Sequence, residues 1–210
     1  MNDPHGSGGS NGSQGSLRSS LSLLARVKAN DPAAWDRLVT LYAPVVLGWC
    51  RRWDLQEQDA ADVFQEVFSA VATHIAGFHR DQPGDTFRGW LRTIAMNKVR
   101  DHFRRLGRDP QGAGGTDALT RLAQLPSPAP IAEEEPRDDS AATNGLFRRA
   151  LELIRDQFEE RTWQAFWRTA VEGRAAADVA ADLRMTAGAV RVAKSRVLQR
   201  LREELGDLIE

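Results

Sequence analysis

Positive charge is concentrated in two short segments of this sequence. Residues 86–105 carry a net charge of +5, because six Arg and Lys side chains are balanced by Asp101 alone. Residues 186–202 also carry a net charge of +5 and contain no acid. Arg and Lys bind phosphate groups and give a salt-dependent affinity that carries little base-sequence information. The two segments therefore predict two separate contacts with nucleic acid.

The second basic segment has the pattern of a helix-turn-helix. A short apolar-periodic stretch, Ala175–Leu183, is followed by the break Arg184-Met185-Thr186 and a long basic stretch from Ala187 onward. Thr186 suits the N-cap of the second helix. A short helix, a tight turn and a longer basic helix are the plan of a helix-turn-helix, whose second helix enters the major groove.

Periodicity divides this second helix into an inward and an outward face. The inward positions are Val190, Ala193, Val197 and Leu201. The outward positions that suit base edges are Arg191, Val192, Ser195, Arg196 and Gln199, and those that suit phosphates are Lys194, Arg200 and Arg202. The alternative is an ordinary helical hairpin whose basic face is simply solvated.

The first basic segment mixes aromatic with positive side chains. Phe87, Trp90, His102 and Phe103 lie among its Arg and Lys residues. Unstacked bases bind by stacking on aromatic planes beside a cationic groove, at about 1–3 kcal/mol per base. The segment therefore suits single-stranded or melted DNA. The alternative for Trp90 and Phe103 is a place in the core, which leaves the loop 81–87 and the exposed side of the helix as the stronger candidate site.

A predicted helix over Asp59–Phe78 carries an acidic face opposite its apolar stripe. This face consists of Asp59, Asp62, Gln65 and Glu66. Three acids and a glutamine within two turns suit a basic partner helix, which they would bind through charge-assisted hydrogen bonds. The alternative is a solvated helix N-terminus, where acids already complement the macrodipole.

Signatures of catalysis, metal binding and membrane insertion are lacking in the sequence. It contains no phosphate-cradling GxxxxGK[ST], no G-x-S-x-G and no H-E-x-x-H, and His74, His79 and His102 have no metal-ligand spacing. Cys50 is the single cysteine and is expected to be a buried small side chain. No apolar run reaches about 18 residues, and Met1–Ser16 lacks the apolar core of a signal peptide. We expect a soluble cytoplasmic protein with no catalytic residues, no cofactor and no metal.

Composition divides the 210 residues into four parts. Residues 1–16 form a Gly/Ser tail that is expected to be disordered. Helical periodicity covers 17–106 and 144–210, whereas 107–143 is rich in Pro and Gly and has a net charge of −4. This pattern predicts an all-α fold of two small domains joined by a flexible acidic linker, with a short helical turn possible at Ala118–Leu125.

Two stretches resemble the regions of one known family. Residues 59–78, DAADVFQEVFSAVATHIAGF, followed by FRGWLRTIAMNKVRDHFRR at 87–105, resemble region 2 of bacterial sigma factors. Residues 178–205, DVAADLRMTAGAVRVAKSRVLQRLREEL, resemble region 4.2. With only these two regions, the chain is similar to the extracytoplasmic-function group of the sigma-70 family. The resemblance implies an all-helical, dissociable subunit of RNA polymerase that directs promoter-specific initiation and helps melt the promoter.

The resemblance also implies roles for the residues. The acidic face Asp59, Asp62, Gln65 and Glu66 would bind the clamp-helix coiled coil of the largest polymerase subunit. Contacts with the −10 element are expected at Arg88, Arg92, Asn97, Lys98, Arg100 and Arg104. Contacts with the −35 element are expected at Arg191, Val192, Lys194, Ser195, Arg196 and Arg200. Such factors can be held inactive by an anti-sigma partner, and the sequence leaves open whether this one is.

One position departs from the family pattern. Arg184 stands where the turn of this motif usually has glycine. If the turn requires a left-handed backbone, a non-glycine residue costs about 1–2 kcal/mol there.

The length of the predicted linker limits the distance between promoter elements that it can bridge. Promoter elements in this family lie one and a half to two helical turns apart, which is about 50–70 Å. A coil of 37 residues has an r.m.s. span of roughly 33 Å and reaches about 120 Å when fully extended. It bridges the elements only when stretched.

Two other functions stay open at this point. One is a regulator that binds duplex DNA through its helix-turn-helix and never joins polymerase. The other is an enzyme that uses His74, His79 or His102.

Overall fold

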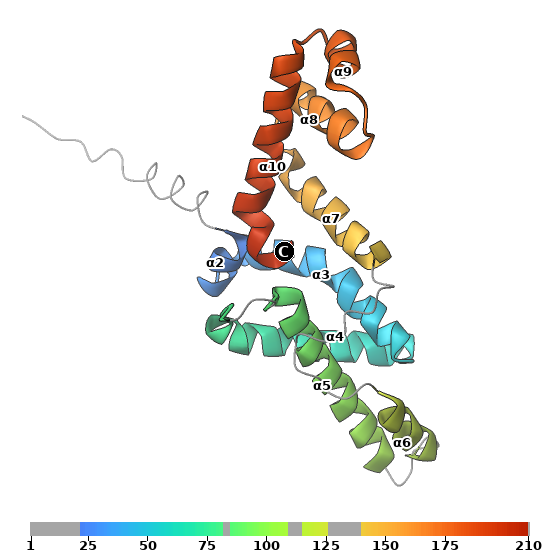
Figure 1. Ribbon diagram of the computed structural model, residues 1–210. Helices are drawn as coiled ribbons and strands as arrows, with labels where there is room; N and C mark the ends of the chain where they lie inside the picture. Colours follow the sequence, from blue (N-terminus) through green and yellow to red (C-terminus); the bar gives the residue numbers. More distant parts are fainter. Residues whose placement is uncertain (1–21, 82–84, 109–114, 126–139, 210) are drawn as a thin grey trace, which may run out of the picture.

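The computed structural model describes residues 22–81, 85–108, 115–125 and 140–209, and every regular element in these ranges is a helix (Figure 1). The all-α prediction is confirmed. The helices are α2 (Leu23–Lys28), α3 (Pro32–Arg52), α4 (Glu57–His74), α5 (Phe87–Arg108), α6 (Gly115–Gln124), α7 (Ser140–Arg155), α8 (Glu160–Phe166), α9 (Ala176–Leu183) and α10 (Ala187–Ile209). A 3₁₀ turn, η1 (Ile75–Gly77), extends α4, and a π-helical turn, η2 (Trp167–Val171), extends α8. The predicted Gly/Ser tail, 1–16, lies outside the described residues.

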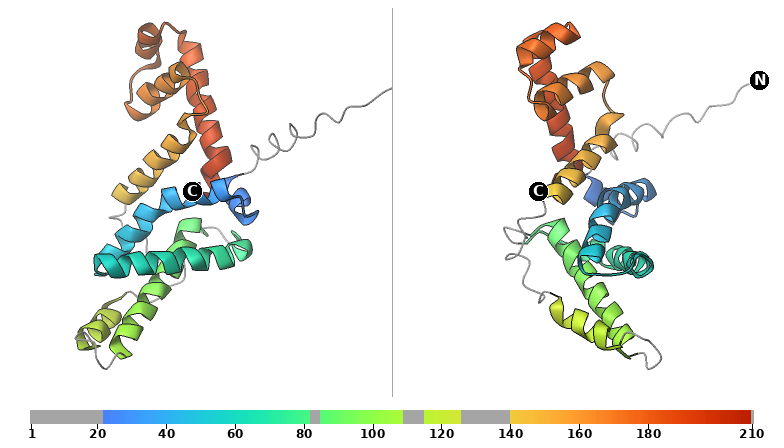
Figure 2. Two further views of the ribbon diagram at one scale, coloured as in Figure 1. Left: turned by 180° about the vertical axis from the view of Figure 1, so that it is seen from behind. Right: turned by 90° about the vertical axis from the view of Figure 1, so that its right-hand side faces the viewer.

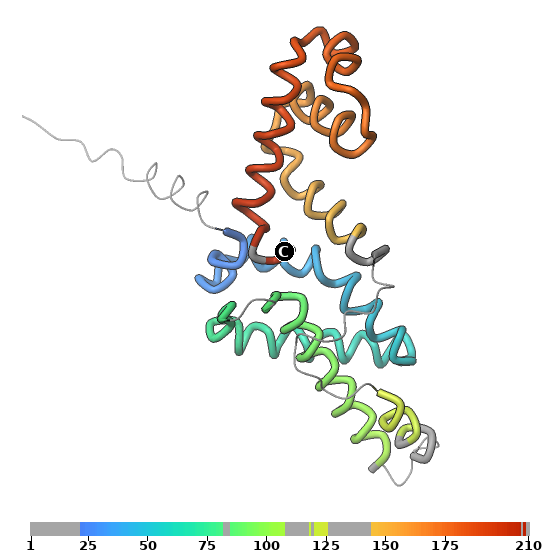
Figure 3. Tube along the Cα trace, viewed as in Figure 1, coloured from blue at the N-terminus to red at the C-terminus, as the bar shows by residue number. Residues whose placement is uncertain are grey.

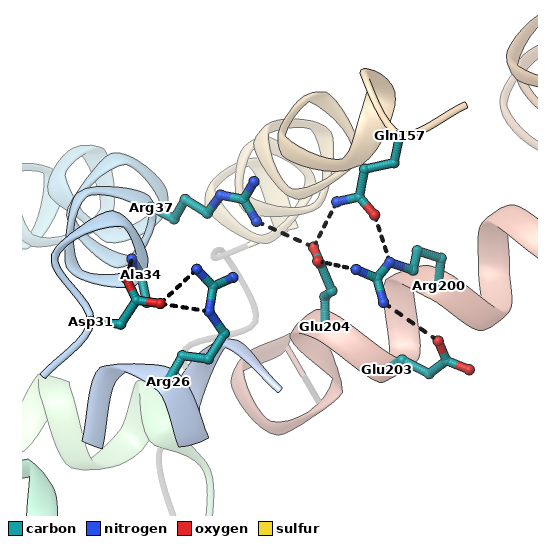
Figure 4. Close-up of polar contacts among 8 residues, drawn as sticks. All are labelled: Arg26, Asp31, Ala34, Arg37, Gln157, Arg200, Glu203 and Glu204. Carbon is teal, nitrogen blue, oxygen red and sulfur yellow. Dashed lines mark hydrogen bonds and ion pairs between the residues drawn. The ribbon is translucent and has the colours of Figure 1, made fainter. Parts of the chain in front are cut away.

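The start of α3 is fixed by Asp31 and Pro32. The Asp31 carboxylate accepts hydrogen bonds from the backbone N–H groups of Ala33 at 3.0 Å and Ala34 at 3.4 Å, as an N-cap does. It also accepts from Arg26 of α2 at 2.8 Å (Figure 4), and this bond lowers the pKa of Asp31. Pro44 lies inside the helix, which nevertheless continues to Arg52.

The apolar stripe predicted for α4 faces the core. Val63, Val67, Val71 and Ile75 are buried, and Phe64 and Phe68 pack against the same core. On α5, Leu91, Val99 and Phe103 are buried, whereas Trp90 and Ile94 are only partly buried. The core placement weighed for Phe103 is therefore confirmed, and Trp90 lies at the edge of the core.

Part of the predicted linker is a helix that packs on α5. In α6, Ala118 is buried and Leu122 packs against the main core. Arg121 donates a hydrogen bond to the backbone carbonyl of Asp54 at 3.0 Å. The short helix considered for Ala118–Leu125 is present, whereas 109–114 and 126–139 lie outside the described residues. The domain limits themselves stay a prediction.

Two apolar clusters of unequal size organise the molecule. The larger one joins side chains of α2–α5 to side chains of α7, α8 and the C-terminal half of α10. Figures 2 and 3 show α7 and the end of α10 against α3 and α2, while α9 and the start of α10 extend away from them. The smaller cluster lies at that far end and contains Ala165, Val179, Ala180, Val190 and Ala193.

The turn between α9 and α10 has the left-handed backbone that we expected to be unfavourable for a residue other than glycine. Arg184 is left-handed, with φ 51° and ψ 48°. The Arg161 guanidinium of α8 donates hydrogen bonds to the backbone carbonyls of Leu183, at 2.6 and 2.9 Å, and of Arg184. The Thr186 hydroxyl accepts from the backbone N–H of Ala189 at 3.1 Å, which confirms the predicted cap. We infer that Arg161 holds in place a turn that a glycine would form without strain.

This turn gives a stability prediction. Arg184→Gly removes the left-handed penalty of about 1–2 kcal/mol and adds about 0.5–1 kcal/mol of chain entropy in the unfolded state. We therefore expect the free energy of unfolding to rise by up to about 1.5 kcal/mol in urea titrations. Arg161→Lys, which keeps the charge but loses the two-carbonyl geometry, should lower it, and less so in the Arg184→Gly background. Equal losses in both backgrounds would refute the coupling between the two residues.

The buried thiol gives a second prediction. Burial raises the pKa of Cys50 to about 11, so the native thiol is almost fully protonated at pH 8. The thiolate is the reactive form. Alkylation at pH 8 should therefore be at least about 100-fold slower in the native chain than in urea, where the pKa is near 8.5. Because ionisation favours the unfolded chain, the free energy of unfolding should also fall as pH rises from about 8.5 toward 11. Equal alkylation rates in the native and unfolded chain would contradict the buried placement of Cys50.

Candidate functional site

The acidic face of α4 is present, and half of it is tied to α5. Asp62 and Gln65 are exposed, whereas Asp59 and Glu66 are partly buried. Glu66 forms an ion pair with Arg105 at 2.7 Å and lies 3.9 Å from the Lys98 ammonium. The face therefore presents Asp62 and Gln65 outward while the Glu66 carboxylate is shared with two basic side chains of α5.

A histidine lies beneath the same face. His102 of α5 is buried, and its Nε2 atom is 3.6 Å from a carboxylate oxygen of Asp59. Among the described residues, this nitrogen has no hydrogen-bond partner. His102 is thus a buried neighbour of the acidic face. His74 is exposed and lines one surface hollow together with Gln65 and Glu66, and His79 is exposed at the hollow before α5.

The predicted −10 residues lie on α5 with unequal exposure. Asn97 and Arg104 are exposed, and Arg88, Arg92 and Lys98 are partly buried. Arg100 differs from these, because only 9% of it is accessible. Burial lowers the pKa of its guanidinium, and the positive charge of Arg104 adds to this effect. The structure brings the other five residues to the surface of α5 and draws Arg100 inward.

The loop before α5 borders a small hollow with an aromatic wall. The hollow measures about 120 Å³ and is lined by Gly77, Phe78, His79, Asp81, Asp85, Thr86 and Trp90. The Phe78 and Trp90 rings are 5.1 Å apart, and Thr86 caps α5 by accepting from the Gly89 backbone N–H at 3.0 Å. The loop candidate of the sequence is therefore a real concavity beside the basic helix. Residues 82–84 lie outside the described part of the chain.

The outward face of α10 is exposed as predicted. Arg191, Val192, Ser195, Arg196 and Gln199 are all exposed. The inward set is buried, and consists of Val190, Ala193, Val197 and Leu201. The predicted division of the helix into two faces is confirmed.

Two of the three α10 side chains that were predicted to contact phosphates are not fully exposed. Lys194 is partly buried. The Arg200 guanidinium donates to Gln157 at 2.6 Å and to Glu204 at 2.5 Å, so it is engaged within the protein. Arg202 is exposed.

Sequence reasoning missed two residues that organise this region. Arg161 was missed because the sequence does not indicate which backbone carbonyls the side chain of a surface arginine contacts. Glu204 left a usable signal, because it stands in the apolar stripe of Leu201, Leu205 and Leu208, and a carboxylate at a buried position needs partners.

The described residues contain neither a membrane-spanning helix nor a metal centre. In the ranges 22–81, 85–108, 115–125 and 140–209, every helix is too short or too polar to cross a bilayer. The same ranges contain no group of three or more His, Cys, Asp or Glu residues placed to hold a metal ion.

Comparison with known proteins identifies the family. A family model described as Sigma-70 region 2 matches residues 38–109. The RNA polymerase sigma-H factor of Pseudomonas aeruginosa is 35% identical over 88 residues, which is 42% of this chain and 44% of that protein. The ECF RNA polymerase sigma factor SigD of Mycobacterium tuberculosis is 33% identical over 187 residues, which is 87% of this chain and 82% of SigD.

A solved structure is also similar. That of CnrH in complex with the cytosolic domain of CnrY shares 21% identity and covers 85% of this chain and 92% of that chain, at a TM-score of 0.35. Family membership follows from the match to SigD, which extends over most of both chains. The chain belongs to the extracytoplasmic-function group of sigma factors, subunits without catalysis of their own that direct RNA polymerase to promoters.

Proposed function

We propose that this sigma factor uses three surfaces for three contacts. The acidic face of α4 binds the clamp helices of the largest polymerase subunit. The exposed side of α5 and the hollow before it hold the −10 element and help to melt it. The outward face of α10 reads the −35 element. These contacts take place in the cytoplasm, where polymerase and DNA are found.

The observation that best supports this proposal is the division of the α10 side chains into an exposed face and a buried face. Every side chain suited to base edges is exposed, and every apolar side chain of the opposite face is buried. A helix with this division enters the major groove without giving up its own packing. Val192, 49% exposed, is available for apolar contact with a thymine methyl group.

On α5, the proposal covers Arg88, Arg92, Asn97, Lys98 and Arg104. Arg100 is left out because it is buried. The hollow lined by Phe78 and Trp90 is suited to an unstacked base, since an aromatic plane lies there beside a basic helix.

The ion pairs of Glu66 link the polymerase contact to the DNA contact. In the chain alone, Glu66 neutralises part of the charge of Arg105 and Lys98. A basic partner helix that binds the Glu66 carboxylate competes with these two side chains. Polymerase binding would thereby release positive charge on α5 toward DNA phosphates. An anti-sigma partner stays an expectation from the family resemblance.

The polymerase contact gives a prediction. Asp62→Arg together with Glu66→Arg reverses the charge of the acidic face and should abolish co-elution with core polymerase on a sizing column, while helicity is retained. The matched control is Asp36→Arg with Glu57→Arg, which makes the same charge change at exposed positions of α3 and α4. Co-elution of the first variant would refute the interface. Tight duplex binding without co-elution of the wild-type chain would favour a stand-alone regulator.

The −35 contact gives another prediction. Arg196→Ala removes a side chain from the base-reading face, so holoenzyme selection from random duplexes should lose preference at one position, worth about 1–3 kcal/mol. Arg202→Ala removes an exposed flanking charge, so it should weaken binding uniformly and lower the salt slope by about 1. If the two variants select the same sequences, the assignment of the reading face is wrong.

A further inference from the structure

A surface hollow lies between α4 and α5, which pack against each other (Figure 1). It measures about 330 Å³, and three residues of the acidic face line it together with two residues of α5: Asp62, Gln65, Glu66, His102 and Arg105. We call this hollow the socket. A water molecule takes about 30 Å³ in the liquid, so the socket has room for one long side chain of a partner.

His102 contributes a fixed nitrogen atom that lacks a partner. The residue is only 9% exposed, and its ring lies edge-on to the buried Phe103 ring, with 5.5 Å between the ring centroids. The Nε2 atom is buried and makes no hydrogen bond to any residue that the structure describes. The Asp59 carboxylate of α4 stays 3.6 Å away from it. Because buried polar atoms in proteins are hydrogen-bonded as a rule, this nitrogen indicates a ligand that supplies the missing partner.

Arg105 shows which chemical group the socket accepts. Its guanidinium lies 2.7 Å from one carboxylate oxygen of Glu66, and its side chain is 60% exposed. The Lys98 ammonium lies 3.9 Å from the other oxygen of Glu66. A guanidinium therefore fits against Glu66, and the one present is exposed enough to be replaced by another.

We propose that the socket binds one arginine side chain of the partner helix, and that His102 positions this side chain and makes its binding depend on pH. The inference rests on the proposed function, because it assigns a partner group to the polymerase-binding face. The incoming guanidinium pairs with the carboxylates of Asp62 and Glu66 and donates an N–H to Nε2 of neutral His102. Its five N–H donors form a planar fork that serves several fixed acceptors at once, which favours arginine over lysine.

A proton on His102 opposes this binding. Imidazole is the side chain that ordinarily changes its charge between pH 5 and 8. A protonated His102 has no acceptor left, pairs with Asp59 and places a positive charge beside the incoming guanidinium. By linkage, the proton and the arginine weaken each other's binding by the same factor. The affinity is therefore full while His102 is neutral and falls as the pH drops.

The charged groups that face His102 come from α4 and α5. They are Asp59, Asp62, Glu66, Lys98 and Arg105. The helices α3, α6 and α10 also contact α5, and no charged side chain described in these three helices lines the socket. Histidine is the residue type in this set that ordinarily titrates near neutral pH, so the pH response of the socket belongs to His102.

The test measures the affinity of the full chain for core polymerase at pH 7.5 and at pH 6.0. We expect the dissociation constant of the wild-type complex to rise by about 3–10-fold at the lower pH, as for the loss of one proton on binding. His102→Gln keeps an acceptor but takes up no proton, so its dissociation constant should rise less than about 2-fold. His74→Gln is the matched control, because His74 is an exposed histidine of α4 that lines the neighbouring hollow, and it should respond as the wild type does.

Proton counting needs no variant, so it decides the question even if His102→Gln does not fold. Calorimetric titration of core polymerase with the wild-type chain at pH 6.0, in two buffers of different ionisation enthalpy, gives the number of protons released on binding. We expect the release of roughly half a proton to one proton. No net release, or an uptake of protons, would overturn the proposal.

Core polymerase variants identify the occupant of the socket. Each arginine of the clamp helices is replaced by alanine in turn, and one of these replacements should abolish the pH response of the wild-type chain. The same response in all of these variants would overturn the arginine assignment. The same response in the wild type and His102→Gln, or a response lost in His74→Gln as well, would overturn the role of His102. A wild-type chain that does not bind core polymerase at pH 7.5 would refute the proposed function itself, and the socket with it.

Discussion

The buried phenol of Tyr42 is the point at which distant parts of the chain meet. Its ring packs edge-on against Phe87 at the start of α5, with 5.1 Å between ring centroids, and its hydroxyl donates to the carbonyl of Leu208 near the end of α10. Burial raises the pKa of this phenol, so the group stays a protonated donor. Because a buried hydroxyl requires a partner, the position of α3 and the end of α10 are set together.

Ion pairs and hydrogen bonds within the protein, as well as the sequence, determine where its positive charge is exposed. The net charge of −1 conceals two basic segments, and the structure ties several of their members internally. Arg200 is held by Glu204 and Arg105 by Glu66. Arg161, outside these segments, is held by the carbonyls of the turn. The basic side chains that remain exposed on α10, among them Arg191 and Arg196, lie where the helix packing leaves one face open. Position on the helix, and not charge density alone, separates the DNA-facing residues from the structural ones.

Periodicity was sufficient to predict the helices and the faces of α4 and α10. Apolar residues at three- and four-residue steps identify which side of a helix is buried, and Val63, Val67 and Val190 followed this rule. The same pattern does not identify the partner of a buried face, so it could not predict that Leu205 and Leu208 join the main core or that α10 contacts α2 and α5. Arg100 and Arg200 were assigned to DNA because their residue type suits phosphate. Arg100 is buried, whereas Arg200 binds Gln157, which is 43 residues away, and Glu204, which stands in an apolar stripe of the sequence.

The continuous helix α10 contributes side chains to two separate cores. Val190 and Ala193 belong to the small cluster with α8 and α9, whereas Leu205 and Leu208 belong to the main core. The turn between α9 and α10 has its own support from Arg161 and Thr186, which lie outside the polar cluster around Glu204. The α9–α10 pair therefore packs on α8 through contacts that are separate from those that α10 makes with α2 and α5. Two separate apolar surfaces on one helix thus join the helix-turn-helix to the main core, and the two clusters share no side chain.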